Sequence, residues 1–217
     1  MISDKLYKEL AEREDEARAM GGPEKLARRK KSGALNARER LDHLLDPDSF
    51  LESGLLAKSA ISVDRTKSPT DGKIAGYGTI EGRDVAVVSN DFTVKGASSA
   101  ATNMKKVAQM QRTAVERGIP LIFLGESSGA RIPDNMGALG MGNLLANNNV
   151  QYRRLRESPW AAAILGMAYG SSTWYGVLSD FCVMRKGAIM AVSSERLVSM
   201  AIGEKVDPEK LGGWRVH

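Results

Sequence analysis

The 217-residue sequence contains few of the side chains that form covalent cross-links or act as general bases in enzymes. Its only cysteine is Cys182, and its only histidines are His43 and His217. A single cysteine excludes an intrachain disulfide, a cysteine-based zinc ribbon and an iron–sulfur cluster. We therefore expect no metal bound by this chain and a reducing, cytoplasmic setting, and any chemistry has to come from other groups.

Long hydrophobic runs are also missing. No apolar stretch approaches the roughly 18 residues that a membrane-spanning helix needs, and the charged start from Met1 to Lys5 is unlike a signal peptide. Hydrophobic residues make up 42% of the chain and charged residues 26%, which are average values for a globular protein. The composition excludes a disordered or collagen-like chain, and we expect no membrane partner. The length fits one domain with an appendage.

The net charge of +5 is concentrated in one short segment. The segment from Glu24 to Arg40 contains seven basic and two acidic residues, so its net charge equals that of the whole chain. Such a segment favours a phosphate-bearing partner, although a solvated helix face is an equally simple explanation. No aromatic residue lies within the run, and no helix-turn-helix or zinc-finger spacing accompanies it. We therefore expect a small polyphosphate ligand and no nucleic acid.

The first 50 residues predict a helical arm. Residues 3–19 have the alternating charges of a polar helix, and a second, basic helix begins at Pro23, because proline suits a first helical turn. Asn36 is followed three residues later by Glu39, which is a capping-box pattern that opens a third helix. The arm is assigned to residues 1–50 and a second domain to residues 51–217.

After residue 50 the pattern predicts an α/β domain. Two β runs flank Glu81-Gly82, which indicates a hairpin, and short apolar runs further on indicate buried strands. Helical patterns alternate with these strands, as in layered α/β folds. The expected strands are 73–80, 83–89, 119–124, 161–167, 181–184 and 188–192, and the expected helices are 98–117, 137–148, 172–178, 194–202 and 207–211.

A strand leading into a loop of very small residues, with a helix directly after it, occurs three times. The three loops are residues 89–99, 125–131 and 166–173. Small residues let a ligand approach the backbone closely, and a helix N-terminus offers unpaired N–H groups and a positive dipole end. The three loops therefore predict a site for a negatively charged oxygen, either a phosphate or a developing oxyanion.

Two chemistries fit such loops. Gly125 to Gly129 matches the G-x-S-x-G nucleophile elbow, with Ser127 as the nucleophile of a serine hydrolase, but the only downstream histidine is the terminal His217. The other chemistry needs no nucleophile. Reactions of thioesters pass through an enolate or tetrahedral oxyanion, and one backbone N–H aimed at that oxygen contributes roughly 3 kcal/mol. Coenzyme A carries phosphates, so it would also give the basic run a partner.

Several blocks of the sequence resemble the N-terminal half of biotin-dependent acyl-CoA carboxyltransferases, the β subunits of propionyl-CoA and methylcrotonyl-CoA carboxylases. The resemblance extends in family order from about residue 20 to the last residue. The blocks are Ala37-Arg38-Glu39-Arg40-Leu41 continuing to Glu52, Gly76-Tyr77-Gly78-Thr79-Ile80 with Asp91-Phe92-Thr93-Val94, Ser127-Ser128-Gly129-Ala130-Arg131-Ile132, Gly166 through Phe181, and Glu209-Lys210-Leu211-Gly212-Gly213 with His217.

The resemblance implies a crotonase-like fold, a spiral of repeated β-β-α units, and acyl-CoA as the substrate of this half. The thioester oxygen would be held by backbone N–H groups of Ser128, Gly129 and Ala130, with Gly170 and Ser171 lining the same pocket. Carboxybiotin would arrive on a separate carrier and release CO2, and the biotin ureido nitrogen would remove the substrate α-proton. The implied partners are a biotin-binding C-terminal half, a biotin carboxylase or carrier subunit, and further copies in an oligomer.

The resemblance also implies four substrate-binding candidates around these loops. Ser127 and Arg131 lie in the first loop, and Arg131 has the alternative role of bracing that loop through a salt bridge. Arg38 and Arg40 are candidates for the adenosine-phosphate end, with ion pairs inside the arm as the alternative.

Three departures from the family pattern bear on the substrate. Ser128 stands where the family usually has glycine, Pro133-Asp134-Asn135 replaces a common Q-E-G, and the second loop has fewer glycines. We expect the acyl pocket to differ accordingly.

Two further functions stay open. A crotonase-like hydratase or decarboxylase acting alone would need a carboxylate near the thioester α-carbon, and Glu126 and Asp134 are the acids closest to the first loop. Alternatively, the chain is a non-catalytic assembly subunit, with Ser128 as a sign of a pocket that has lost its function. The first alternative predicts turnover without biotin, and the second predicts partner binding without any effect of ligand.

Overall fold

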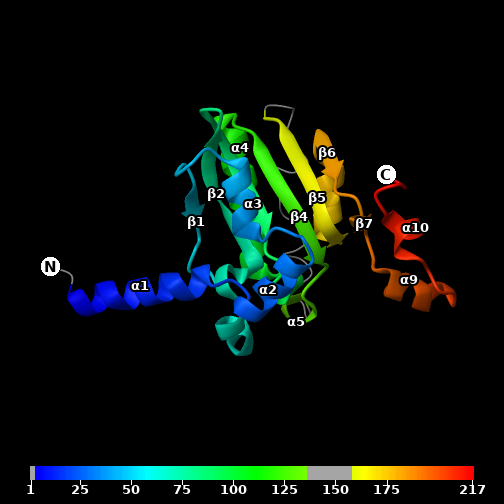
Figure 1. The fold of residues 1–217 in the computed structure, drawn as a ribbon, viewed down its shortest axis with the longest axis horizontal. Coiled ribbons are helices and arrows are strands. Elements are labelled where there is room, and N and C mark those ends of the chain that lie inside the picture. The colour runs from blue at the N-terminus through cyan, green and yellow to red at the C-terminus, as the bar shows by residue number, and fades with distance from the viewer. Residues whose placement is uncertain (1–2, 136–157) are drawn as a thin grey trace.

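The computed structural model describes residues 3–135 and 158–217, so the expected helix 137–148 lies outside the described residues. The described part is built around a mixed sheet (Figure 1). Its strands follow one another in the order β1-β2-β3-β4-β5-β6, and β7 pairs with β5. They are β1 (Leu51–Ser53), β2 (Lys73–Ile80), β3 (Arg83–Asn90), β4 (Leu121–Ser128), β5 (Trp160–Tyr169), β6 (Phe181–Met184) and β7 (Ile189–Ala191).

The direction of the strands changes in the middle of the sheet. β1, β2 and β3 pair antiparallel, whereas β3, β4, β5 and β6 run parallel. The predicted hairpin is confirmed, since Ile80 pairs with Arg83 across Glu81 and Gly82, which both have positive φ as a tight two-residue turn requires. Because β3, β4 and β5 are parallel, their carboxyl ends lie at the same edge of the sheet.

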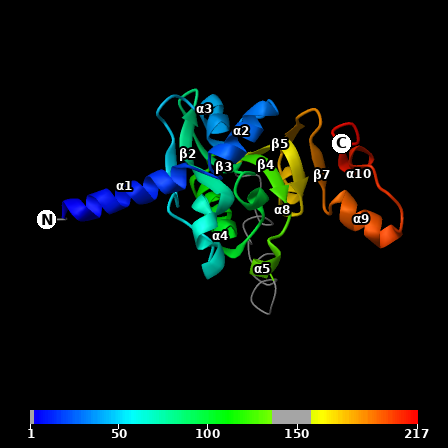
Figure 2. The ribbon, with the colours of Figure 1, turned by 60° about the horizontal axis from the view of Figure 1, so that its bottom comes forward.

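Helices cover both faces of this sheet (Figure 2). From β2 onward the described elements repeat the order strand, strand, helix, with the short α5 between β4 and β5. The helices are α1 (Asp4–Arg18), α2 (Pro23–Lys31), α3 (Ala37–Leu44), α4 (Ala101–Arg117), α5 (Ile132–Asn135), α8 (Ser171–Val177), α9 (Glu195–Ile202) and α10 (Pro208–Gly212), and the 3-10 turns are η1 (Ser62–Lys67), η2 (Pro69–Gly72) and η3 (Lys95–Ala97).

The helix α3 belongs to the core and is not a detached arm. It begins at the predicted capping box, in which the Asn36 side chain accepts hydrogen bonds from the backbone N–H groups of Arg38 and Glu39. Its buried Leu41 and the following Leu45 pack with strand residues of β2 and β3. The opposite face of the sheet is covered by α4. The boundary between residues 1–50 and 51–217 stays a prediction, but the third helix of that arm is part of the folded layer.

Two strands are longer than the sequence predicts. β4 runs through Ser128 and β5 through Tyr169, so several of the small residues expected in loops are strand residues. They pair with each other, Ser127 opposite Ala168 and Ser128 opposite Tyr169, which satisfies backbone groups that a loop would leave to solvent. The loops after these strands therefore begin only at Gly129 and Gly170.

The strand at the end of the described sheet is not buried as the apolar pattern predicts. Phe181 in β6 is 65% exposed and Val183 is 46% exposed. On the other side of the molecule α1 extends away from the sheet (Figure 1), and its Leu6 and Leu10 are exposed whereas Ala17 is buried. Within residues 3–135 and 158–217, none of the helices is both long and apolar enough to cross a membrane.

The burial of α3 gives a test by mutation. Leu41→Ala should lower the free energy of unfolding by about 2–5 kcal/mol, because it removes a leucine that is 2% exposed in a packed core. Leu10→Ala on α1 is the control, since Leu10 is 44% exposed and its loss should change stability by about 0.5 kcal/mol or less. Urea unfolding measures the free energy of unfolding of both variants. Equal effects of the two substitutions would contradict the burial of α3 in the core.

Candidate active site

The three small-residue loops meet at the carboxyl edge of the parallel strands. The Ser99 N–H donates to the Gly129 carbonyl oxygen over 2.8 Å, and the Arg131 N–H donates back to the Ser99 carbonyl oxygen over 2.8 Å. The Ser99 hydroxyl also contacts the Ser171 hydroxyl at the start of α8. The loops that follow β3, β4 and β5 are thus joined into one surface. This edge is where open α/β sheets bind their ligands.

Two residues of the predicted site have their backbone N–H groups engaged inside the protein. The Gly129 N–H donates to Ser127 Oγ over 3.0 Å, and the Gly170 N–H donates to the carbonyl oxygens of Ala191 and Val192. These two N–H groups are thus used within the fold, and a contact of Gly129 or Gly170 with the substrate stays a prediction. Their roles are conformational, since φ is +101° at Gly129 and +62° at Gly170, a region that favours glycine.

Other amides at the same place remain available. Among the described residues the Ala130 N–H has no hydrogen-bond partner, and Ala130 is exposed. Ser171 is the first residue of α8, and the first amides of a helix have no partner within the helix. Gly170 lies against Gly129, because a Cβ on Gly170 would be 3.7 Å from the Gly129 Cα. Within the part of the chain that the structure describes, Ala130 and Ser171 are thus two loop residues whose N–H groups have no partner in the fold.

The structure contradicts the serine hydrolase alternative. Ser127 is fully buried, and its Oγ lies within hydrogen-bond distance of the Ala97 carbonyl oxygen while accepting from the Gly129 N–H. His43 lies on α3, and His217 Nε2 lies 2.9 Å from the Met190 carbonyl oxygen. No histidine contacts the Ser127 hydroxyl, so the elbow lacks the base that a nucleophilic serine needs.

Ser128 lies at the exposed end of β4, where its hydroxyl covers the turn η3. A Cβ on Gly96 would lie 2.6 Å from Ser128 Oγ, so the glycine at that position is required by this close approach. Ser128 is exposed although the residues on both sides of it are buried. The Ser128 hydroxyl thus lies at the surface against η3, and its effect on the acyl pocket stays a prediction.

Arg131 braces the loop instead of facing solvent. Its guanidinium forms a buried ion pair with Asp71, with 2.6 Å between Nη1 and Oδ1, and Nε donates to Ser98 Oγ over 3.2 Å. Burial raises the pKa of the Asp71 carboxyl, and the positive charge of Arg131 opposes that rise. Of the two roles predicted for Arg131, the structure favours the salt bridge that holds the loop.

Arg38 and Arg40 are not free to contact phosphates. Arg38 Nη1 binds Glu52 over 2.8 Å, and the 6% exposed Arg40 binds Glu126 over 2.8 Å. Burial lowers the pKa of Arg40, while the carboxylate of Glu126 raises it. The expectation that these two residues bind the adenosine-phosphate end is therefore not supported, because each side chain is already paired within the fold.

Glu126 connects the N-terminal helices to the strand that leads into the site. Its carboxylate also accepts from Arg29 of α2, so two arginines neutralise one buried acid. A Cβ on Gly166 would lie 2.2 Å from Glu126 Oε1, which explains the glycine in the middle of β5. A carboxylate held in this way cannot act as a base at a substrate carbon. The structure thus removes Glu126 from the hydratase or decarboxylase alternative.

A buried polar network below the loops was not predicted. Lys73 is fully buried and Lys106 is 7% exposed, and the side chains of Asn90 and Asn103 are buried beside them. Lys106 Nζ donates to the carbonyl oxygens of Gly54, Thr70 and Lys73. The sequence gives little signal for this network, because its members lie far apart in the chain and a lysine at a strand end usually indicates solvent.

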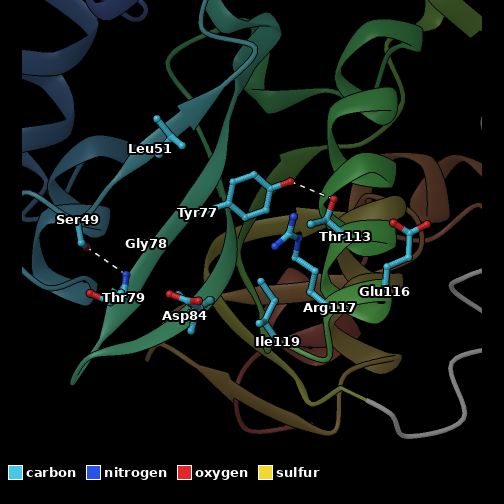
Figure 3. Close-up of a pocket in the computed structure, with 11 residues that line it drawn as sticks. Ser49, Leu51, Tyr77, Gly78, Thr79, Asp84, Thr113, Glu116, Arg117 and Ile119 are labelled. Carbon is cyan, nitrogen blue, oxygen red and sulfur yellow. Dashed lines mark hydrogen bonds between the residues drawn. The ribbon is translucent and has the colours of Figure 1, made fainter.

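Figure 3 shows a pocket of about 580 Å³ at a different place on the sheet. It lies near the start of β3 and the end of α4, where the Tyr77 hydroxyl donates to Thr113 Oγ1 and the Arg117 side chain points between them. Asp84 and Glu116 also line it, so its charges are mixed. This pocket is at the opposite end of β3 from the three loops and contributes nothing to them.

These features define the class of protein. Residues 28–217 match the family model of the carboxyl transferase domain, and the chain belongs to that family. The fold is α/β and crotonase-like, as the sequence resemblance implied. In this chain the fold consists of elements in a repeated β-β-α order, with parallel strands that end at one edge of the sheet.

Known relatives cover almost the whole chain. It is 35% identical over 213 residues to the methylmalonyl-CoA carboxyltransferase 12S subunit of Propionibacterium freudenreichii subsp. shermanii, covering 96% of this chain and 40% of the relative. It is 36% identical over 199 residues to a putative propionyl-CoA carboxylase beta chain of Bacillus subtilis, covering 91% and 39%. The chain thus spans about two fifths of the length of these relatives.

A solved structure shows the same fold. The crystal structure of transcarboxylase 12S, a hexamer with methylmalonyl-coenzyme A and methylmalonic acid bound, matches with a TM-score of 0.86 and 32% identity. The match covers 100% of this chain and 43% of that chain.

The pairing of Glu126 gives a second test. Glu126→Gln should lower the free energy of unfolding by about 3–5 kcal/mol, because it leaves the buried Arg29 and Arg40 without their carboxylate. Glu24→Gln is the control, since Glu24 is exposed and lies 3.9 Å from Arg28, so its loss should cost about 0.5 kcal/mol or less. Denaturant unfolding measures the free energy of unfolding of both variants. An effect of Glu126→Gln as small as that of Glu24→Gln would contradict a stabilising role of the two ion pairs at Glu126.

The buried lysines predict that stability rises with pH. Burial lowers the pKa of Lys73 to about 7 and that of Lys106 to about 8, whereas both have values near 10.5 when unfolded. Between about pH 7 and pH 9 the unfolded chain binds more protons, so the free energy of unfolding increases with pH. Urea unfolding across this range should show that increase, with a smaller slope in Lys73→Met. A wild-type slope that is flat or falling would contradict the burial of charged lysines.

Proposed function

We propose that this chain binds acyl-CoA and stabilises the enolate of its thioester during carboxyl transfer from carboxybiotin. The observation that carries the proposal is the free N–H of Ala130 at the point where the loops after β3, β4 and β5 meet. Membership of the carboxyl transferase domain family and the methylmalonyl-coenzyme A bound in the transcarboxylase 12S structure support the choice of substrate class.

The role of the chain is to place hydrogen-bond donors where negative charge develops. Loss of the α-proton moves charge onto the thioester oxygen, and the N–H groups of Ala130 and Ser171 are the donors for that oxygen. Preorganised donors of this kind are each worth about a hundredfold or more in rate. Gly129 and Gly170 keep the turns in conformations that bring these amides together, and Ser128 narrows the space for the acyl group.

The residues present fit a reaction in which the base is not supplied by this chain. Glu126 is neutralised by Arg29 and Arg40, and the Ser127 hydroxyl is used inside the loop. Carboxybiotin, attached to a separate carrier, supplies the carboxyl group and the proton acceptor when it is bound. The chain then orients the thioester, excludes water with its loops and holds the charge on the oxygen, which needs main-chain donors more than acidic or basic side chains.

The phosphates of the substrate are assigned to α2. With Arg38 and Arg40 paired, the cations that stay exposed in the basic segment include Lys30 and Lys31. The helix is joined to the loop after β3, because the Gly21 N–H donates to Thr93 Oγ1 and Lys25 Nζ donates to the Thr93 carbonyl oxygen. These two contacts with Thr93 attach the start of α2 to the segment after β3, which supports the assignment.

Complete carboxyl transfer in this proposal needs more than the present chain. The chain spans about two fifths of its relatives, so we assign biotin binding to a C-terminal half on the same or another chain. A biotin carboxylase and carrier subunit would load the biotin, and several copies would assemble into an oligomer, as in the hexamer of transcarboxylase 12S. No nucleic acid or membrane partner is included, and no metal site is proposed.

Calorimetry with a substrate and a matched analogue tests the proposal. Wild-type protein should bind propionyl-CoA more tightly than S-propyl-CoA, the thioether that lacks the carbonyl oxygen. Ala130→Pro removes the N–H, so its propionyl-CoA affinity should fall about fivefold, the value of about 1 kcal/mol for one hydrogen bond. Its affinity for the thioether should stay unchanged, which shows that the phosphate contacts and the fold are intact.

Other outcomes identify the alternatives. Absence of binding by wild-type protein to either compound, combined with tight binding of a partner subunit, would establish an assembly subunit without catalytic function. Turnover of an acyl-CoA by this chain without biotin would establish a crotonase-like hydratase or decarboxylase. Equal affinity of wild-type protein for the thioester and the thioether would contradict the role of the amides.

A further inference from the structure

The buried amine of Lys73 has no part in the function proposed above, although it lies directly below the site. Lys73 is the first residue of β2, and its whole side chain is enclosed. A lysine is rarely found in such a position unless its ammonium group is paired or hydrogen-bonded. The contacts of Nζ therefore show what the lysine holds together.

Lys73 Nζ connects the ends of two segments that lead into the site. It donates to Asn90 Oδ1 over 3.2 Å and to the Ala97 carbonyl oxygen over 3.3 Å. Asn90 is the last residue of β3, and Ala97 is the last residue of η3. The ammonium group thus joins the end of β3 to the end of η3.

Asn90 extends this connection to the other two loops. Its Nδ2 donates to the Glu126 carbonyl oxygen over 2.8 Å and to Ser172 Oγ over 3.1 Å. Glu126 lies in β4 and Ser172 in α8. One buried amide therefore contacts the strand before the Gly129 turn and the helix after Gly170, while its oxygen binds Lys73.

A second line of hydrogen bonds leads from Lys73 to the Gly129 turn. The Ala97 carbonyl oxygen also accepts from Ser127 Oγ over 3.3 Å, and Ser127 Oγ accepts from the Gly129 N–H over 3.0 Å. Ala97 has φ of +49°, which is uncommon for a residue with a side chain and has to be held by its surroundings. Lys73 contacts the carbonyl group of this residue.

We propose that Lys73 and Asn90 are positioning residues that set the orientation of the Gly129–Ala130 turn, and hence of the Ala130 N–H, in the site. The meaning of that orientation for catalysis rests on the proposed function, but the orientation itself does not. Both residues act through the turn and neither touches a substrate.

Lys73 should lose its proton near neutral pH. Burial lowers its pKa to about 7; Asp71 raises it, and Arg131 and Lys106 lower it. Asp71 comes from η2, Arg131 from the segment after β4 and Lys106 from α4, and Asn90 from β3 is the uncharged neighbour that binds Nζ. Loss of the proton weakens donation to both acceptors, so the turn should respond to pH.

Nuclear magnetic resonance of protein labelled with nitrogen-15 tests the proposal without a ligand. In Lys73→Met the Gly129 amide signal should move and its hydrogen exchange should become about tenfold faster. This variant and its control are measured near pH 6, where Lys73 keeps its proton whether or not Lys106 is present. Lys106→Met is the matched control, because it removes a buried lysine whose Nζ binds the carbonyl oxygens of Gly54, Thr70 and Lys73 and not the three loops. Its Gly129 exchange should stay within about twofold of wild type after correction for global stability.

A measurement on wild-type protein covers the case in which Lys73→Met does not fold. The Gly129 and Ala130 amide signals should titrate together with a midpoint near pH 7, the pKa of Lys73. Asn90→Ala should reduce the size of this titration, since it breaks one of the two lines of hydrogen bonds between Lys73 and the turn and leaves the line through Ala97 and Ser127. Signals that do not titrate, or equal effects of Lys73→Met and Lys106→Met on Gly129, would overturn the proposal.

Binding of propionyl-CoA separates this inference from the proposed function. If the turn responds as described but wild-type protein does not bind propionyl-CoA, the positioning role stands and the proposed function fails. If wild-type protein binds and the turn is unaffected in Lys73→Met, the proposed function stands and the positioning role fails.

Discussion

Three parallel strands that end at one edge of a sheet bring the segments after them into contact, whatever residues those segments contain. In this chain the segments after β3, β4 and β5 are built from small residues, so their backbones come close enough for Ser99 to exchange hydrogen bonds with Gly129 and Arg131. The rest of the site depends on that contact. The turns are too short to be stable alone, and the buried groups beneath them, including Asn90, Asp71 and Glu126, hold them from below.

Ion pairs inside the fold explain where the positive charge of the sequence goes. Arg29, Arg38 and Arg40 lie in a basic segment that suits a phosphate ligand, yet each of them has an acidic partner in the fold. The charges therefore serve first to attach α2 and α3 to the sheet. Burying an unpaired charge costs several kcal/mol, so the two ion pairs at Glu126 favour one position of α2 and α3 on the sheet. Within the basic segment, Lys30 and Lys31 on α2 stay exposed.

The sequence was sufficient for features that depend on neighbours in the chain. The turn at Glu81-Gly82, the capping box of Asn36 and Glu39 and the α/β class follow from local pattern, and each is present in the structure. The small-residue loops are present only in part, because the first residues of two of them belong to β4 and β5. The family also follows from short motifs in order. Features set by distant residues were not accessible. The extension of β4 depends on its pairing with β5, the partner of Arg40 is 86 residues away, and the environment of Lys73 is made by segments up to Arg131.

The exposed strand β6 affects how readily another strand can pair with the sheet. Its outer edge bears backbone donors and acceptors, and Phe181 and Val183 extend from it into solvent. Soluble proteins normally protect such an edge with charges, proline or a covering segment, because it is a template for another strand. When no other segment covers this edge, a strand of a second molecule can form hydrogen bonds along it. Self-association through the sheet then competes with the native arrangement.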